Sequence, residues 1–278
     1  MHRVGLFWFN HDLRIDDNIA LNFAAAQVDQ LLCLYCLPPS SKGVDSAEPS
    51  ALSRHRQQFL LESLQDLDCS LKSYDQHLFV AYESGVSAIA QLITQHNITQ
   101  VFCSTPTGYY EQQQWQLLAK RYRMIDFHAI DNNRLFSLEQ LPFELSNLPS
   151  SFSKFRRAVE ALEVSSPALR LASLPPSPAS PQTWQAQFPA FEKNKTALFA
   201  GGEQNGAVHV SRYFEQELAS SYKQTRNGLD GMDYSTKFSP WLANGGLSPR
   251  RVIHELRRYE QRVASNDSTY WIYFELLW

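Results

Sequence analysis

The sequence predicts an α/β protein in which an N-terminal, doubly wound parallel sheet of five strands is followed by a long linker and the start of an all-α domain. Three observations support this fold class. Short apolar runs alternate with helical patterns over residues 1–130, which is typical of parallel strands joined by right-handed crossovers. Residues 131–200 include a proline-rich stretch, and residues 201–278 carry only helical patterns. A chain of 278 residues has room for two such domains.

The predicted strands are short runs rich in aromatic and branched residues, at residues 4–9, 31–37, 78–82, 101–103 and 124–128. Helical patterns lie between them at residues 19–27, 52–67, 86–96 and 112–122. In the second helix, apolar residues recur at helical spacing at Phe59, Leu60, Leu64 and Leu67. No G-x-G-x-x-G motif follows the first strand and no G-x-x-x-x-G-K-[ST] motif occurs. The sequence therefore gives little support for the dinucleotide or triphosphate sites that such sheets usually carry.

Between the two parts, residues 165–191 contain six prolines among serine and alanine, a composition that holds neither a helix nor an inner strand. This stretch is predicted to join the domains. Two helical faces follow, the first formed by Val210, Phe214, Leu218 and Tyr222 and the second by Val252, Leu256, Tyr259 and Val263. A last helix is predicted to begin near Asp267 or Ser268 and to continue through Trp278.

The end of the chain is unusual for a terminal helix. Eight of the ten residues from Thr269 to Trp278 are apolar or aromatic, and no capping residue follows them. A terminal helix would leave these side chains without a packing partner. We therefore expect the sequence to stop in the middle of a domain.

Composition and charge restrict the functional classes. Hydrophobic residues make up 44% of the chain, and a net charge of -3 confines any nucleic-acid contact to a local basic patch. Cys33 and Cys36 form a C-x-x-C spacing inside an apolar run, where strand side chains are favoured over a redox pair or half of a zinc site. No metal site is predicted.

The apolar run at residues 4–9 is too short for a signal peptide or a membrane span, so the chain is predicted to be cytoplasmic.

The strongest functional pattern lies at residues 233–250. Three hydroxyl groups and one ammonium group gather around a Ser-Pro pair, at Ser235, Thr236, Lys237 and Ser239. Ser239 is predicted to cap a short helix that Pro240 begins, and such a helix start attracts phosphate. Gly245–Gly246 are predicted to end this helix and Ser248–Pro249 to begin the next. The pattern indicates a pyrophosphate site, although two capped helices without a ligand would use the same residues.

Four segments of the chain resemble DNA photolyases and cryptochromes, most closely the DASH-type cryptochromes, and occur in the family's order. They occupy residues 7–18, 222–228, 233–250 and 270–278. The resemblance implies an N-terminal α/β domain that can hold a light-harvesting antenna, usually a folate such as methenyltetrahydrofolate. It also implies a helical domain that binds FAD. The chain corresponds to about the first half of a family member, and the expected domains are residues 1–130, a linker at 131–200, and 201–278.

Site residues follow from the resemblance by alignment of the motifs. FAD would contact Tyr222, Ser235, Thr236, Lys237, Phe238, Ser239 and Trp271. Arg226 would contact DNA, while Glu275 and Trp278 would face the lesion as the catalytic residues. A protonated Glu275 would hydrogen-bond to a dimer carbonyl. Glu111 matches the antenna-binding glutamate.

Each of these residues also has a purely structural interpretation. Tyr222 ends an apolar stripe and would pack in a core without a ligand. Glu111 would be an exposed acid at a helix start, where it is favourable on electrostatic grounds alone. Arg14, between Asp12 and Asp16–Asp17, favours an ion-paired brace of its loop over a ligand contact.

The implied function is a blue-light-driven, FAD-dependent lyase that splits cyclobutane pyrimidine dimers, chiefly in single-stranded DNA. Two alternatives stay open: a blue-light photoreceptor without repair, and an inactive antenna-domain protein left by a natural truncation. The residues present do not separate repair from signalling, since both use this flavin site. Half a flavin pocket would leave much of the ligand exposed, so the 278-residue chain alone is expected to be inactive.

Overall fold

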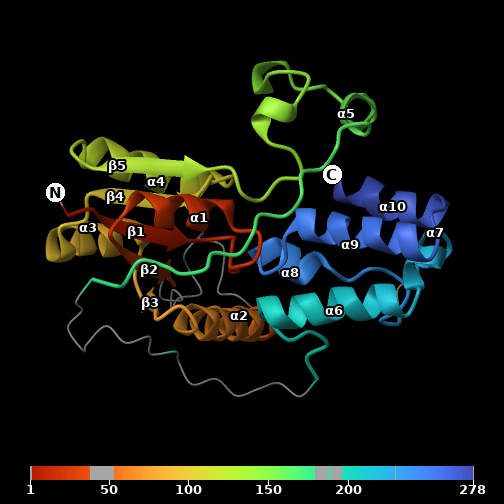
Figure 1. Ribbon diagram of the computed structural model, residues 1–278, viewed down its shortest axis with the longest axis horizontal. Coiled ribbons are helices and arrows are strands. Elements are labelled where there is room, and N and C mark those ends of the chain that lie inside the picture. The colour runs from red at the N-terminus through yellow and green to blue at the C-terminus, as the bar shows by residue number, and fades with distance from the viewer. Residues whose placement is uncertain (1, 38–52, 179–187, 189–195, 229, 278) are drawn as a thin grey trace, which may run out of the picture.

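The computed structural model describes residues 2–37, 53–178, 188, 196–228 and 230–277. A five-stranded parallel sheet and a group of helices lie side by side in it (Figure 1). The strands are β1 (Val4–Phe9), β2 (Gln30–Cys36), β3 (Leu78–Ala81), β4 (Gln100–Ser104) and β5 (Asp126–Ile130). Their order is β3-β2-β1-β4-β5. Strands β2 and β3 are therefore added on one side of β1, and β4 and β5 on its other side. This doubly wound order confirms the predicted fold class.

Helices cover both faces of the sheet. They are α1 (Ile19–Gln27) and α2 (Arg54–Lys72) on one face, and α3 (Gly85–His96) and α4 (Tyr109–Arg121) on the other. Alternate residues of β1 serve the two layers: Phe7 and Phe9 pack with α1 and α2, while Leu6 and Trp8 pack with α3 and α4. Every residue of β1 is buried, as expected for the central strand of a covered parallel sheet.

The second half of the structure is helical. It contains α6 (Glu203–Glu215), α7 (Tyr222–Thr225), α8 (Ser239–Asn244), α9 (Pro249–Arg262) and α10 (Asp267–Leu276). The predicted stripe from Val210 to Tyr222 is not one helix, because Glu217 adopts a left-handed backbone that an α-helix cannot continue through. Both ends of that stripe nevertheless lie in one apolar core. In the described part of the chain, no helix combines the length and apolar character that crossing a membrane requires.

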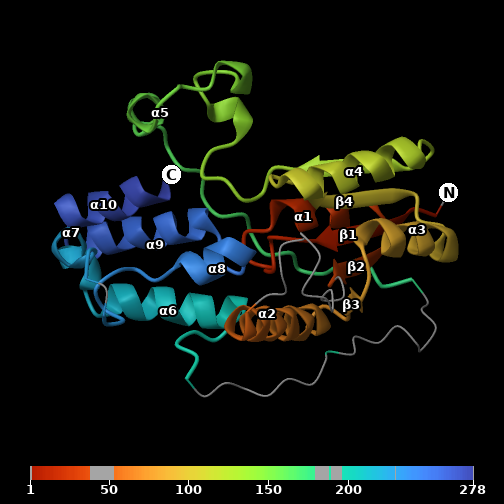
Figure 2. The same ribbon diagram turned by 180° about the vertical axis from the view of Figure 1, so that it is seen from behind.

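Residues 131–178 connect the halves and pack against both. They include α5 (Phe152–Val159) in a lobe that stands away from the sheet in both views (Figure 1, Figure 2). Phe136 and Val159 are buried in the helical core. Further along, Leu174 is buried in the core of the sheet, and the Pro176 carbonyl accepts a hydrogen bond of 3.0 Å from the Leu31 amide. Most of the remaining proline-rich segment lies outside the described residues.

Arg14 joins the two halves from the loop after β1. Its side chain is 1% exposed, and its guanidinium donates to the carbonyls of Asp16, Asp17, Asn132 and Gly245 and to the side chain of Asn133. The expected brace is therefore present, but its partners are carbonyl oxygens, so the prediction of an ion-paired brace was wrong. Asp12 is engaged elsewhere, because its carboxylate accepts from the Ser104 hydroxyl at 2.6 Å and the Asn10 amide at 2.9 Å.

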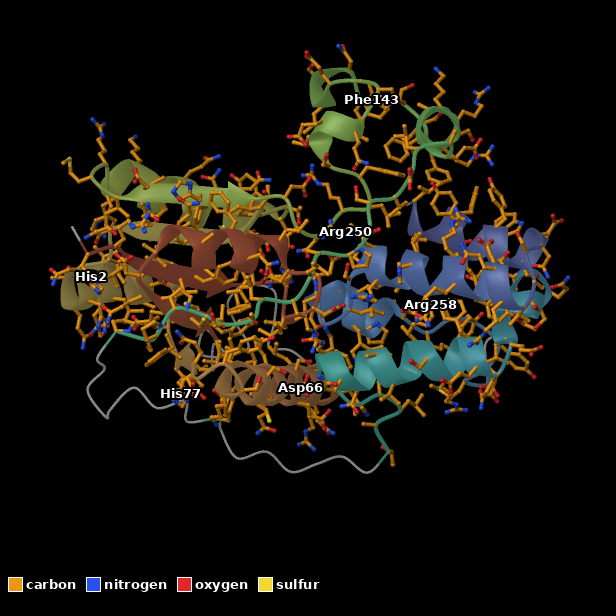
Figure 3. The ribbon with its side chains drawn as sticks, viewed as in Figure 1. His2, Asp66, His77, Phe143, Arg250 and Arg258 are labelled. Carbon is orange, nitrogen blue, oxygen red and sulfur yellow. The ribbon has the colours of Figure 1, made fainter. Side chains whose placement is uncertain are left out.

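A buried ion pair adds a second connection. Arg250 of α9 lies where the helices meet the sheet (Figure 3) and donates from Nε to Asp17 Oδ2 at 2.9 Å. Asp17 is fully buried and also accepts from the Ser248 hydroxyl and the Ala168 amide. At the other side of the junction, Asp66 of α2 accepts from the first turn of α6 at 3.2 Å (Figure 3). The two halves are thus held by polar contacts that neither half can satisfy alone.

The cysteines offer a first test of this core. Burial raises the pKa of Cys33 to about 12 and that of Cys36 to about 12, and it raises the pKa of Cys103 as well, whereas Cys69 is exposed. Because the thiolate is the reactive form, iodoacetamide at pH 8 is expected to modify Cys69 at least roughly tenfold faster than the other three. Mass spectrometry of the native protein over time measures this. Labelling of Cys36 as fast as Cys69 would contradict the assignment of C-x-x-C to a buried strand.

Candidate functional site

The hydroxyl-rich segment 235–239 crosses α6 on its way to α8. Phe238 anchors it: this side chain is 2% exposed, and its ring meets that of Tyr213 edge to face with centroids 5.4 Å apart. A second anchor comes from α6, where His209 Nε2 lies 2.8 Å from the Thr236 carbonyl oxygen. Ser235, Thr236 and Lys237 are half-buried, and Ser239 is exposed. Phe238 and His209 therefore hold the backbone of this segment, while its four polar residues keep surface that is open to solvent.

These polar side chains make no hydrogen bond or ion pair within the described part of the chain. Among the described residues, the hydroxyls of Ser235, Thr236 and Ser239 and the ammonium of Lys237 have no hydrogen-bonding or ionic partner. Lys237 also holds a left-handed backbone with φ of 53°, which is uncommon for lysine and concentrates at ligand sites. Unsatisfied donors packed into so short a segment fit a polyanion such as a pyrophosphate.

The structure corrects one detail of this segment. Ser239 does not cap α8, because the cap position belongs to Phe238, whose anchored backbone is already helical (φ -74°, ψ -20°). Ser239 falls in the first turn, and its hydroxyl makes no capping bond. The other predicted helix boundaries are confirmed. Gly245 ends α8 with φ of 72°, and the Ser248 side chain caps α9 by accepting hydrogen bonds from two backbone amides. With six residues, α8 has too small a dipole to contribute much to anion binding. The indication of an anion site therefore rests on the unpaired donors at residues 235–239.

Three more predicted residues meet where α7 approaches α10. Arg226 Nη1 donates to Glu275 Oε1, and the same guanidinium lies 4.3 Å from the centroid of the Trp271 ring. A cation over an indole ring is a favourable contact. Arg226 therefore joins Trp271 and Glu275 in one cluster. Trp278 lies outside the described residues.

Tyr222 takes the structural role that its sequence position allowed. It is 6% exposed and lies in the same helical core as Phe238. Burial raises the pKa of its hydroxyl. The predicted flavin contacts are therefore divided between this core, the donors at 235–239, and Trp271 on α10.

Glu111 lies far from these residues, in the first turn of α4. Its Oε1 is 3.7 Å from Nε2 of His11, which follows β1. His11 in turn lines two cavities that sequence reasoning missed, because no local pattern marks them. One, of about 400 Å³, is formed by the ends of β1 and β2, the start of α2, and α8.

The other cavity, of about 360 Å³, lies outside the carboxyl ends of β1, β4 and β5 and is closed by α8. Thr105 and Asp131 are among its lining residues. Burial raises the pKa of Asp131, although the nearby Arg134 guanidinium opposes this effect. The position between β1 and β4 is the switch point of the strand order, where open α/β sheets bind their ligands.

Comparison with known proteins decides the family. Residues 5–180 match the family described as DNA photolyase. The chain belongs to the DNA photolyase family. Within it, the chain is 42% identical to cryptochrome DASH of Idiomarina loihiensis, over all of this chain and 62% of that protein. It is 41% identical to cryptochrome DASH of Vibrio parahaemolyticus, over 99% of this chain and again 62% of the relative.

Solved structures agree with this membership. The crystal structure of the Synechocystis cryptochrome superposes on all of this photolyase-family chain with a TM-score of 0.87 at 33% identity. An archaeal photolyase from Sulfolobus tokodaii, solved with two FAD molecules, shares the fold with a TM-score of 0.68 at 20% identity. The chain covers 60% and 59% of these two proteins, respectively. It therefore spans about 60% of the length of these four photolyase-family members.

Proposed function

We propose that this chain forms the antenna domain, at residues 1–130, and the first part of the FAD-binding domain, at residues 201–278, of a DASH-type cryptochrome with repair activity. The intact protein would be a cytoplasmic, blue-light-driven lyase that splits cyclobutane pyrimidine dimers, preferring single-stranded DNA. The observation that carries this proposal is the set of unpaired donors at residues 235–239 in a chain whose relatives are cryptochromes DASH.

FAD, when bound, would supply the light-driven electron that breaks the dimer. The work of this chain is to bind and orient. Ser235, Thr236, Lys237 and Ser239 would donate to the pyrophosphate, and the buried ring of Phe238 keeps their backbone in place. Trp271, already packed beneath a guanidinium, would lie beside the flavin.

Arg226 and Glu275 would serve the DNA. A partly exposed guanidinium suits a phosphate of the strand that carries the lesion, and the carboxyl group of Glu275 would meet the dimer. Trp278 would stack on the extracted bases. A dimer must leave the base stack to reach a flavin in the helical domain, and extraction is easier from single strands.

The antenna would be a folate, such as methenyltetrahydrofolate, held near Glu111. In support of this, His11 lines the switch-point cavity and lies 3.7 Å from this carboxylate, and the Sulfolobus photolyase, which shares the fold, was solved with two FAD molecules. A carboxylate can accept hydrogen bonds from the amino and ring N–H groups of a pterin.

Absorption spectroscopy and a repair assay together test the proposal. The intact protein is expected to retain FAD or to bind it on titration, and to restore thymines in a dimer-containing single-stranded oligonucleotide under blue light. Flavin binding without repair would favour a photoreceptor. A protein that binds a folate but neither retains nor takes up FAD would favour an antenna-domain protein without enzymatic activity.

The ammonium of Lys237 gives the sharpest test of the pyrophosphate site. Lys237→Met is expected to weaken FAD binding roughly 10- to 100-fold, the range for losing one charged hydrogen-bond donor. Riboflavin, which has no phosphate, should bind both proteins alike. The matched control is Lys223→Met, because Lys223 is exposed and already paired with Asp267 at 2.9 Å. Flavin fluorescence titrations of wild type and the two variants with FAD and with riboflavin measure these affinities, and an equal loss of FAD affinity in both variants would contradict the assignment.

A further inference from the structure

His209 of α6 is held in one orientation by two aromatic neighbours. Its ring stacks on Trp241 with centroids 5.0 Å apart and planes 24° apart, and it meets Phe238 edge to face at 5.8 Å. Trp241 is itself buried and donates from Nε1 to the Ala200 carbonyl at 3.1 Å. The imidazole therefore has little freedom to turn. The sequence does not single out this residue, because its partner lies 27 positions further along the chain.

The contact with Thr236 defines which ring nitrogen carries hydrogen. A carbonyl oxygen only accepts hydrogen bonds, so Nε2, at 2.8 Å from it, must be the donor. The bond fixes the peptide group immediately before Lys237, whose backbone is left-handed. Thr236 is thereby attached to α6, and Phe238 is attached to the core beneath. Thr236 and Phe238 are thus both anchored, and Lys237 lies between them. Within the described part of the chain, the Lys237 ammonium has no hydrogen-bonding or ionic partner.

We propose that His209 is a positioning residue for an anion site at residues 235–239: its Nε2–H holds the Thr236 carbonyl so that the hydroxyls and the Lys237 ammonium are arranged before a ligand arrives. The identification of that ligand with FAD rests on the proposed function. A fixed segment binds more tightly than a loose one, because the ordering entropy has already been lost. His209 itself does not touch the ligand in this arrangement.

Two variants separate the hydrogen bond from the ring. His209→Phe keeps an aromatic ring on Trp241 and removes the donor. His209→Gln removes the ring and keeps an N–H donor the same number of bonds from the backbone. Amide exchange followed by mass spectrometry on the peptide 233–240 reports the order of the segment without any ligand. Exchange is expected to be roughly three- to tenfold faster in His209→Phe, the range for one hydrogen bond, and within about twofold of wild type in His209→Gln.

FAD titration provides the second measurement. FAD affinity should fall roughly three- to tenfold in His209→Phe and recover in His209→Gln, with riboflavin affinity unchanged. If wild type does not bind FAD, the proposed function fails for this chain, and amide exchange still decides the role of His209. If wild type and His209→Phe bind FAD equally, the inference fails while the proposed function stands. Exchange that stays near wild type in His209→Phe and rises in His209→Gln would show that ring packing, and not the donor, orders the segment.

A measurement on the unaltered protein covers the case in which the variants do not fold. In protein labelled with ¹⁵N-histidine, the ring nitrogens report which of them is protonated. The geometry requires hydrogen on Nε2 of His209. A neutral ring protonated only on Nδ1 would overturn the proposal.

Discussion

Gly245→Ala is expected to destabilise the protein by about 3–5 kcal/mol. A Cβ atom at this position would lie 1.9 Å from the His11 carbonyl oxygen, which is backbone and cannot rotate away. The residue also has φ of 72°, a conformation that alanine adopts only with strain. Steric overlap and backbone strain act together here, at the point where α8 contacts the loop after β1. Urea unfolding followed by circular dichroism measures the change in unfolding free energy.

The neighbouring glycine is the control. At Gly246 an added Cβ would meet only the Asn244 side chain at 3.2 Å, with other atoms at 3.8 Å. Gly246→Ala is therefore expected to change stability by less than about 1 kcal/mol. The loss of unfolding free energy should therefore be several-fold larger for Gly245→Ala than for Gly246→Ala. Similar losses in both would mean that the loop after β1 does not approach α8 as closely as the structure shows.

The second large effect is expected at the buried ion pair. Asp17→Ala leaves Arg250 with no carboxylate partner, and it removes the acceptor of Ser248 and of the Ala168 amide. Removing one member of a buried pair typically destabilises by about 3–5 kcal/mol, because the remaining charge stays in a site of low polarity. The same urea titration measures the loss.

Two further variants identify its cause. Asp17→Asn keeps the size and tolerates the left-handed backbone, so its loss should fall between those of wild type and Asp17→Ala. Asp29→Ala removes an exposed pair with Arg3, and such pairs contribute little, so its stability should stay near wild type. An equally stable Asp17→Ala would indicate that the junction does not depend on this charge.

The sheet could be predicted from sequence because its elements are locally encoded. The run at Val4–Phe9 and the helix at Ile19–Gln27 have the predicted bounds, since apolar period and turn residues agree there. The last strand begins two residues later than expected. Met124 is apolar but 96% exposed, in the turn after α4, so its hydrophobicity indicated a strand where there is none.

The site was less predictable, because its contacts join distant residues. Motif chemistry indicated the donors at 235–239, yet the cap at Ser239 depended on the backbone of Phe238, which a tertiary contact sets. The carbonyl partners of Arg14 come from residues up to 231 positions away, so local charges suggested the wrong partners. The cavities beside His11 form only when α8 closes them, and no pattern within one segment reveals that.

The position of α8 has a consequence for recombination. At its end, the Asn244 carbonyl accepts from the Leu13 amide and the Gly245 carbonyl from Arg14, while its side chains wall both cavities of the sheet. The halves are consequently not interchangeable parts. A chimaera that takes its sheet from one relative and its helices from another must carry the loop at 10–17 and the turn at 244–251 as a matched set. Homologous exchange is therefore expected to succeed with breakpoints that leave these two segments from the same parent.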